Sequence, residues 1–160
     1  MNPDESIQKL KEAFEFYTQS QFEKAEEICL EVMASEVDHF HALQLLGSVK
    51  RSQGELVKAK NIFMRAVRIN SGDIGVIFNL GNACRDLREW SNALACYRRA
   101  IDLDPADPII LYEHANILKE KGDVDEAISD YKRAIELKPD FVDAYLNLGN
   151  TLREMGEFKE

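Results

Sequence analysis

Small and bulky apolar residues recur along the chain at an interval of 34 residues, with no insertion or deletion between repeats. Two of the columns defined by this interval contain small residues, and two independent columns in one register rarely arise by chance. The four columns are Ala13, Gly47, Gly81, Ala115 and Gly149; Ala25, Ala59, Ala93 and Ala127; Cys29, Phe63, Tyr97 and Tyr131; and Val32, Ala66, Ala100 and Ala134. The pattern predicts an array of one repeated structural unit.

Helix caps and helix breakers occur twice in each repeat, which predicts two helices per unit. Asn2 before Pro3 and Asp107 before Pro108 are typical helix starts. The segment 20–23, Ser-Gln-Phe-Glu, has the spacing of a capping box, and the segment beginning at Asp123 repeats it. We expect helices over about 4–19, 20–34 and 38–52, the last capped by Asp38, then a helix ending near 69, turns at 88–89 and 122, and a final helix ending near 155.

In this spacing the sequence resembles the tetratricopeptide repeat family. The family pattern has a small residue at the eighth position of a repeat, Ala at the twentieth, an aromatic residue at the twenty-fourth, Ala at the twenty-seventh and Pro at the thirty-second. Two successive repeats carry it, with Gly81, Ala93, Tyr97, Ala100 and Pro105, and with Ala115, Ala127, Tyr131, Ala134 and Pro139. The resemblance implies an all-α fold, a right-handed superhelical solenoid of antiparallel helical hairpins whose first helices line a concave face.

The resemblance divides residues 1–160 into a single array of four complete repeats and a partial fifth. The expected repeats cover 6–39, 40–73, 74–107, 108–141 and 142–160. The fifth has a whole first helix but only the start of a second, so we expect the sequence to be a fragment of a longer repeat protein. Its uncovered apolar residues predict either self-association through the last helix or poor order over residues 156–160. These residues are Val142, Tyr145, Leu148, Leu152 and Phe158.

Composition excludes several classes of partner. The formal net charge of −9 disfavours nucleic acid, whose phosphates attract clustered Lys and Arg. No apolar run approaches the roughly 18 residues that span a bilayer, and the N-terminus lacks a signal-peptide pattern, so we expect no membrane contact and a cytoplasmic location. Cys29, Cys84 and Cys96 lie in columns that are mostly apolar or aromatic elsewhere, which favours small core residues over disulfides or metal ligands.

The sequence gives little support to a catalytic interpretation. Phosphate-binding glycine motifs, zinc-protease motifs and the serine-hydrolase elbow are absent, so we expect neither an enzyme nor a cofactor or metal. His39 and His41 point in different directions from a helix start, which disfavours a shared metal ion. His114 occupies a column that contains leucine in other repeats. We expect it to be buried and hydrogen-bonded rather than catalytic.

The first helices carry the more informative residues, because their second, fifth, sixth, ninth, twelfth and thirteenth positions are expected to face the groove. Asparagines recur there, and an amide that both donates and accepts can bind an extended peptide backbone whatever its side chains are. The pattern resembles the asparagine ladder in the repeat arm of O-linked GlcNAc transferases, although asparagine would also suit packing between first helices. The asparagines are Asn79, Asn82, Asn116, Asn147 and Asn150.

Charged and aromatic residues flank this line of asparagines. The twelfth position is basic, and it would either read acidic side chains of a ligand or pair with the acidic thirteenth position. The fifth position has no lysine, which disfavours the clamp that one subclass of the family uses for the C-terminal carboxylate of chaperones. Phe78 and Tyr112 stand there and offer apolar contact instead. The basic residues are Arg51, Arg85, Lys119 and Arg153.

These residues predict a non-catalytic protein–protein interaction scaffold that binds an extended peptide or partner segment in the concave groove. The alternative is the substrate-recruiting arm of a larger enzyme such as a glycosyltransferase, with a catalytic domain beyond Glu160. The sequence that follows residue 160 would separate the two interpretations.

Overall fold

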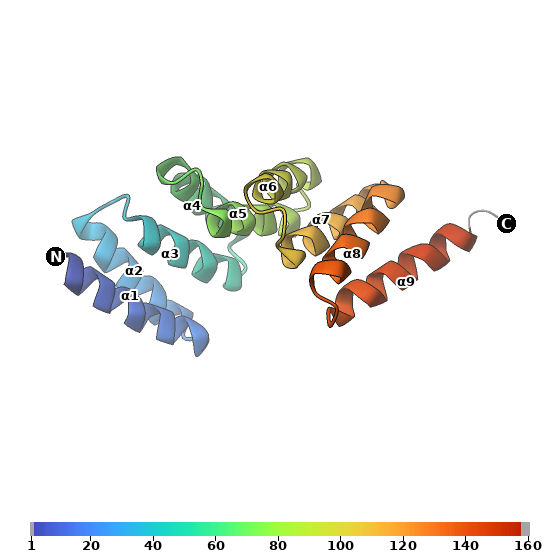
Figure 1. The fold of residues 1–160 in the computed structure, drawn as a ribbon. Helices are drawn as coiled ribbons and strands as arrows, with labels where there is room; N and C mark the ends of the chain where they lie inside the picture. Colours follow the sequence, from blue (N-terminus) through green and yellow to red (C-terminus); the bar gives the residue numbers. More distant parts are fainter. Residues whose placement is uncertain (1, 158–160) are drawn as a thin grey trace. The chain divides into compact units, whose positions relative to one another are not determined.

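The computed structural model describes residues 2–157, and every regular element in this range is an α-helix (Figure 1). The helices are α1 (Pro3–Thr18), α2 (Phe22–Ser35), α3 (Phe40–Ser52), α4 (Leu56–Ile69), α5 (Ile74–Asp86), α6 (Trp90–Leu103), α7 (Pro108–Lys121), α8 (Val124–Leu137) and α9 (Val142–Glu157). The all-α fold class predicted from the sequence is confirmed.

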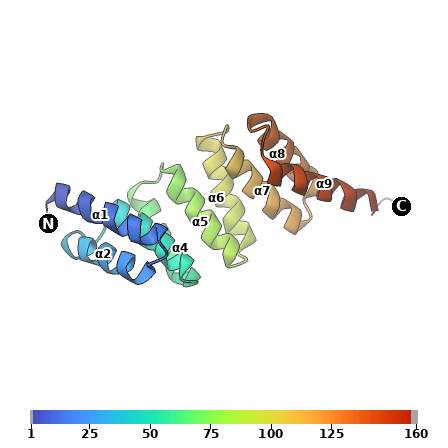
Figure 2. The same ribbon diagram turned by 90° about the horizontal axis from the view of Figure 1, so that it is seen from below.

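The first of two compact units, Met1–Leu87, contains α1 to α5. In this unit α1 packs against α2, and α3 against α4, so that each pair forms a helical hairpin. Contacts of α2 with α3 and of α4 with α5 stack these elements in chain order, as the view in Figure 2 shows for α1, α2 and α4. First helices also meet directly, α1 with α3 and α3 with α5.

The second unit, Arg88–Glu160, contains α6 to α9 in its described part. The pair α7 and α8 forms a hairpin, with α6 packed on α7 and α9 packed on α8. The first helices α7 and α9 again meet directly. The same order of contacts therefore occurs in both units, as repetition of one unit requires.

The repeating columns form contacts within a hairpin and with the first helix of the next one. Every residue of the twentieth, twenty-fourth and twenty-seventh columns has no exposed surface, including the large side chains of Phe63, Tyr97 and Tyr131. At the eighth position, a Cβ added to Gly47 would lie 2.6 Å from the ring of Phe63. A side chain there would displace the ring, so the small column lets the two helices approach closely. The register read from the sequence is correct.

The cysteines behave as the sequence predicted. None of the three forms a disulfide within the described residues, and Cys29 and Cys84 are buried while Cys96 is half-buried. Burial, with a smaller contribution from the nearby carboxylate of Glu26, raises the pKa of the Cys29 thiol to about 12. The thiol therefore stays protonated at neutral pH and acts as a small apolar side chain.

The last helix, α9, exposes apolar residues that the equivalent helices bury. Tyr145 is 50% exposed, whereas Leu111, one repeat earlier, is 1% exposed. Leu152 is 43% exposed and its equivalent, Leu118, is fully buried. Phe158, which the sequence assigns to the same patch, lies outside the described residues. In this range α9 lacks the second helix that covers the same face of α7.

Helix starts follow the predicted caps in part. Asn2 and Asp107 each accept hydrogen bonds of 2.8 Å from backbone amides in the first turn of their helices. The predicted cap at Asp38 is wrong, because His39 Nδ1 accepts the bond from the first turn of α3, at 3.3 Å. Asp38 instead pairs with the guanidinium of Arg65, at 2.7 Å. The carboxylate of Asp38 therefore joins the turn before α3 to α4.

The predicted capping box at 20–23 is also wrong. Ser20 has a positive φ of 59°, and Gln21 is the N-cap of α2 without a side-chain capping bond. The amides of Ser20 and Gln21 bond to the carbonyls of Tyr17 and Phe16, at 3.0 and 2.9 Å. These residues therefore close the C-terminus of α1, where a left-handed residue satisfies the last carbonyls.

The left-handed closing residue recurs at the same position of other repeats. Gly54, Arg88 and Gly122 have φ values of 79°, 59° and 89°. Asp123 follows as the N-cap of α8 but makes no side-chain capping bond, so the second predicted capping box is wrong too. Glycine takes this conformation without strain, whereas Ser20 and Arg88 do not.

Candidate peptide-binding surface

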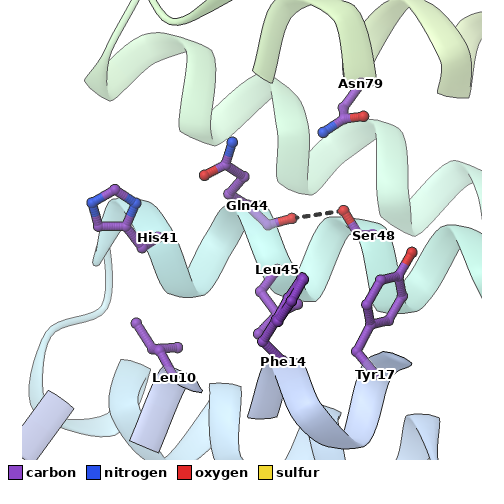
Figure 3. A pocket seen from close by; sticks show the side chains of 8 residues that line it. All are labelled: Leu10, Phe14, Tyr17, His41, Gln44, Leu45, Ser48 and Asn79. Carbon is purple, nitrogen blue, oxygen red and sulfur yellow. Dashed lines mark hydrogen bonds between the residues drawn. The ribbon is translucent and has the colours of Figure 1, made fainter. Parts of the chain in front are cut away.

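A pocket of about 390 Å³ opens in the first unit between α1, α3 and α5 (Figure 3). The Ser48 hydroxyl donates to the backbone carbonyl of Gln44 at 3.1 Å, and the side-chain amides of Gln44 and Asn79 make no hydrogen bond with the other lining residues. Two amides are thus presented to the pocket. The lining residues are Leu10, Phe14 and Tyr17 from α1, His41, Gln44, Leu45 and Ser48 from α3, and Asn79 from α5.

Each lining residue occupies a position that the repeat predicts to face the groove. They stand at the second, fifth, sixth, ninth or twelfth position of a first helix. In Figure 3 the side chains of Leu10, Phe14 and Tyr17 lie on one side, and the amides of Gln44 and Asn79 lie on the other. The pocket therefore has an apolar wall facing a wall that can both donate and accept hydrogen bonds.

Two further hollows adjoin this pocket and share residues with it. One, of about 510 Å³, is lined by Ile7, Leu10, Phe14 and His41 together with the charged side chains of Lys11 and Glu15. The other, of about 320 Å³, extends along the first turns of α1 and is also lined by Ile7, Leu10 and His41. The concave region therefore continues along α1 toward its N-terminus.

The predicted ligand-binding residues of α5 differ in their accessibility. Asn79 is half-buried and lines the pocket. Asn82, one turn later, is only 6% exposed. Phe78 is half-buried and is not among the residues that line the pocket. Of these three residues, Asn79 alone lines the pocket.

In the second unit the predicted residues bond to one another. Asn116 Oδ1 accepts from the Tyr131 hydroxyl at 2.7 Å and from the Asn147 amide at 2.9 Å. The same Asn147 amide donates to the Tyr112 hydroxyl at 3.0 Å. Burial, with the nearby Tyr112, raises the pKa of Tyr131, so its hydroxyl stays a donor. Asn150, on the next turn of α9, is exposed.

The residue types at the ninth and twenty-fourth positions are correlated, in agreement with this bonding. The correlation was not recognised from the sequence. Repeats with tyrosine at the twenty-fourth position have asparagine at the ninth, and repeats without tyrosine do not. The pairs are Tyr97 with Asn82, Tyr131 with Asn116, Phe63 with Ser48, and Cys29 with Phe14. At Asn116 the amide oxygen satisfies a hydroxyl of the fully buried Tyr131. Asparagine thus has a packing role in this column beside any role in binding.

The basic residues of the twelfth position form ion pairs between neighbouring first helices. Arg51 Nε lies 2.6 Å from an oxygen of Asp86, and Lys119 Nζ lies 3.1 Å from Glu154. Each pair joins the twelfth position of one repeat to the thirteenth of the next. Arg85 also approaches Asp86, at 3.2 Å. Arg153, at the end of the column, is exposed on α9 and has interactions of its own.

Lys50 is a further charged residue that the sequence analysis did not single out. It occupies a column with the apolar Cys84 and Leu118, and it is 8% exposed. Its ammonium lies 2.5 Å from Glu26 and 2.7 Å from Glu55. Burial by itself would lower the pKa of Lys50, but the bonds to the two carboxylates outweigh it and raise the pKa. Lys50 thus links the end of α3 to α2 and to the N-cap of α4.

His114 is buried and hydrogen-bonded, as the sequence predicted. It is 3% exposed, and its Nδ1 lies 2.6 Å from Asp130 Oδ2. Within residues 2–157, Nε2 has no hydrogen-bond partner. The role of Asp130 was not anticipated, although its column contains Ile28 and Ile62 in other repeats and so marks it as unusual.

The described residues provide no metal centre and no membrane span. Among residues 2–157, no group of three or more His, Cys, Asp or Glu side chains is placed to hold a metal ion. The rings of His39 and His41 are 6.3 Å apart, and His39 is engaged as a helix cap. In the same range, no helix has both the length and the apolar character needed to cross a bilayer.

Comparison with protein families identifies the repeat. A model described as TPR repeat matches residues 81–122 and 115–156, and a model described as tetratricopeptide repeat matches residues 40–73. The second match coincides with the second repeat expected from the spacing. A comparison with curated proteins gives no significant match.

Solved structures share the fold. A crystal structure of MamA protein has a TM-score of 0.85 and 22% identity, covering 94% of this chain and 82% of that one. MamA 41-end from Desulfovibrio magneticus RS-1 has a TM-score of 0.88 and 15% identity, covering 98% and 88%. YrrB, titled a TPR protein with an unusual peptide-binding site, has a TM-score of 0.80 and 22% identity, covering 94% and 78%. At these identities the likeness establishes the fold.

Proposed function

Because the chain belongs to the tetratricopeptide repeat family, we propose that it is a non-catalytic scaffold that binds a peptide or partner segment along its first helices. The observation that carries the proposal is the pocket between α1, α3 and α5. It is built from positions that are predicted to face the groove. Its apolar wall lies opposite the side-chain amides of Gln44 and Asn79, which make no hydrogen bond with the other lining residues. Such a surface suits a peptide, which offers both apolar side chains and backbone hydrogen-bonding groups.

The second unit supports the proposal less directly. There the side chains of Asn116 and Asn147 are hydrogen-bonded to each other and to tyrosine hydroxyls, while Asn150 is exposed. A ligand that bonded to Asn116 or Asn147 would have to replace bonds that are already made, which lowers its net gain. We therefore assign the primary contacts to the first unit. Asn150 is the secondary site in this proposal, because it is exposed and belongs to the asparagines that resemble the ladder.

The class of partner follows from charge. The chain has a formal net charge of −9, and the twelfth-position cations Arg51 and Lys119 are paired with carboxylates. These two cations are already paired, so they do not form the basic surface that a polyanion such as nucleic acid requires. We propose a protein or peptide partner, met in the cytoplasm. The recruiting arm of a larger enzyme is a special case of the same binding role.

Selection of binding peptides tests the proposal. A random peptide display library is selected on the chain, and the affinity of the enriched peptides is measured by fluorescence anisotropy. We expect Gln44→Ala with Asn79→Ala to weaken binding by roughly 1–3 kcal/mol, the cost of leaving backbone groups of the peptide unpaired. The matched control is Asn61→Ala, which makes the same change at an exposed residue of α4.

Three outcomes can be told apart. Loss of affinity in the pocket variant, with the Asn61→Ala protein unchanged, supports binding at the pocket. Peptides that bind both variants equally well place the site elsewhere, and failure to enrich any peptide argues against the binding role itself. Circular dichroism of each variant confirms that the helices are retained.

A further inference from the structure

The first helix differs from every other first helix on its groove-facing side. At the second, fifth, ninth and twelfth positions α1 carries Ile7, Leu10, Phe14 and Tyr17. In each other repeat at least two of these four positions are polar or charged. The other sets are His41, Gln44, Ser48 and Arg51; Gly75, Phe78, Asn82 and Arg85; Ile109, Tyr112, Asn116 and Lys119; and Asp143, Leu146, Asn150 and Arg153. We call the apolar set on α1 the α1 seam.

The α1 seam lines open surface, although Leu10 also packs against the core residues Ala13, Cys29 and Leu46. Phe14 is 55% exposed and Ile7 is 52% exposed, although both are large and apolar. Leu10 lines the pocket and both adjoining hollows, and Tyr17 lines the pocket. A continuous apolar surface of this kind on a folded protein is typical of an interaction site.

The α1 seam is apolar at all four positions, and the spacing of these positions fits a helical ligand better than an extended one. The intervals between its four residues are three, four and three, which is the interval of an apolar stripe in a coiled coil. With a rise of about 1.5 Å per residue, the side chains lie about 4.5, 10.5 and 15 Å from Ile7 along the axis. A partner helix repeats these distances. An extended peptide places side chains of one face about 6.8 Å apart and loses register by its third residue.

The charges beside the seam define the partner further. Among the residues that line the 390 Å³ pocket none carries a carboxylate, a guanidinium or an ammonium group, although 31% of the chain is charged. Lys11 and Glu15 are exposed, lie one turn apart, and line the neighbouring hollow. The apolar stripe of a ligand would meet the seam, and an acidic and a basic residue at its edge would meet Lys11 and Glu15.

We propose that the α1 seam docks an amphipathic α-helix of a partner protein, with leucine-like side chains at heptad spacing and one flanking pair of opposite charges. The proposal rests on the peptide-binding function above and names its ligand class for the first unit. The helix lies along α1, and its apolar side chains enter the hollows beside Leu10 and Phe14. Helix recognition of this kind relies on anchors at intervals of three and four residues.

The probe is a labelled peptide of about 21 residues with Leu at the a and d positions of each heptad and Glu or Lys elsewhere. Its matched control replaces one central outward-facing residue by proline. This change leaves every apolar side chain in place but prevents a continuous helix. Anisotropy titrations with the 160-residue chain, at nanomolar peptide, should show at least about tenfold weaker binding of the proline peptide.

A second comparison locates the site on the protein. Phe14→Glu should weaken binding of the helical probe by about tenfold or more, because it places a charge in the seam. Leu30→Glu is the control, since Leu30 is 49% exposed on α2 and lines none of the three hollows. It should leave the affinity within about twofold. Both substitutions are at exposed residues, and helical content by circular dichroism checks folding.

Failure of this inference can be told from failure of the proposed function. Equal binding of the helical and proline peptides, or an unchanged affinity in Phe14→Glu, would overturn the helical ligand. Display-selected peptides that still depend on Gln44 and Asn79 would leave the wider function standing in that case. A complex of two protein copies formed through α1, seen by sedimentation and abolished by Phe14→Glu, would show that the seam serves self-association and would overturn a partner helix.

Discussion

The imidazole Nδ1 of His114 lies 2.6 Å from a carboxylate oxygen of Asp130, and the pair joins α7 to α8 inside one hairpin. The side chains are only 4% and 17% exposed. Their columns contain leucine at Leu46 and Leu80, and isoleucine at Ile28 and Ile62. One repeat has thus replaced an apolar contact by a polar pair. The desolvation of such a pair commonly exceeds what the pair returns in stability.

We expect the double variant His114→Leu with Asp130→Ile to be more stable than the wild type by about 1–2 kcal/mol, because it restores an apolar contact. Each single variant should be destabilised by about 1–3 kcal/mol, since it leaves one buried polar group unpaired. Urea unfolding followed by circular dichroism measures all four proteins. A double variant less stable than both singles would contradict this account.

Asn116 tests whether the asparagines serve packing. Asn116→Ala removes the acceptor of the buried Tyr131 hydroxyl, so we expect a loss of about 1–3 kcal/mol in the free energy of unfolding. Tyr131→Phe in the same background should recover most of it, because no hydroxyl is then left unpaired. Asn150→Ala, at an exposed position, is the control and should change stability by less than about 0.5 kcal/mol.

Two glycines of one column should respond in opposite directions. Gly47→Ala places a methyl group 2.6 Å from the ring of Phe63, and we expect a loss of about 1–3 kcal/mol. Gly149→Ala meets no neighbour within 4 Å and gains up to about 1 kcal/mol of helix propensity. Thermal unfolding of both variants measures the difference. Equal shifts would mean that Phe63 moves aside freely.

The left-handed residue after α1 offers a stabilising substitution. Ser20 has a φ of 59°, which costs a residue with a Cβ about 1 kcal/mol or more. Ser20→Gly should therefore raise the free energy of unfolding by up to about 1 kcal/mol, and the reverse change Gly54→Ser should lower it by a similar amount. Urea midpoints of the two variants provide the test, and a destabilised Ser20→Gly protein would refute it.

Stability in acid should depend on Glu55. Hydrogen bonds from Lys50, at 2.7 Å, and from Lys58 lower the pKa of Glu55 below its ordinary value. A carboxyl group of this kind contributes stability above its unfolded-state pKa, and the contribution is lost as the pH falls through the lowered pKa. The raised pKa of Lys50 affects stability on the alkaline side. Its contribution to the free energy of unfolding is lost only as the pH rises through the raised pKa.

We therefore expect Glu55→Gln to lose less stability than the wild type between about pH 5 and pH 3, because the titrating group is gone. Urea midpoints at several pH values measure the slope. Glu27→Gln, at an exposed residue of α2, is the control. Identical slopes for Glu55→Gln and the wild type would show that the bonds to Lys50 and Lys58 do not contribute.

The helices and the core could be predicted because one interval forces the same burial in each repeat. Ala59, Ala93 and Ala127 occupy equivalent positions, and each has no exposed surface. Local caps were less predictable. The pattern of serine and glutamate at 20–23 fits a helix start, but the backbone of Ser20 completes the preceding helix and so takes the left-handed conformation. Sequence alone does not decide between these competing uses of one turn.

The sequence predicted which positions face the pocket, but it predicted only some of the hydrogen bonds that their side chains make. Positions such as Gln44 and Asn79 face the pocket because the helical period places them there. The bonds of Asn116 depend on residues that lie 15 and 31 positions away, and those distances follow from packing. The apolar character of the α1 seam was present in the sequence, but its significance needed the exposure of Ile7 and Phe14.

The constant interval of 34 residues has a consequence for how such a chain can change length. Each junction, such as α2 with α3 or α4 with α5, is built from the same columns, so a whole repeat can be duplicated or excised and the ends still match. An insertion of a few residues inside a helix would instead rotate the rest of that helix out of register with its neighbours. Unequal recombination at the boundaries of a repeat is therefore the route by which this protein could gain or lose binding surface without rebuilding its core.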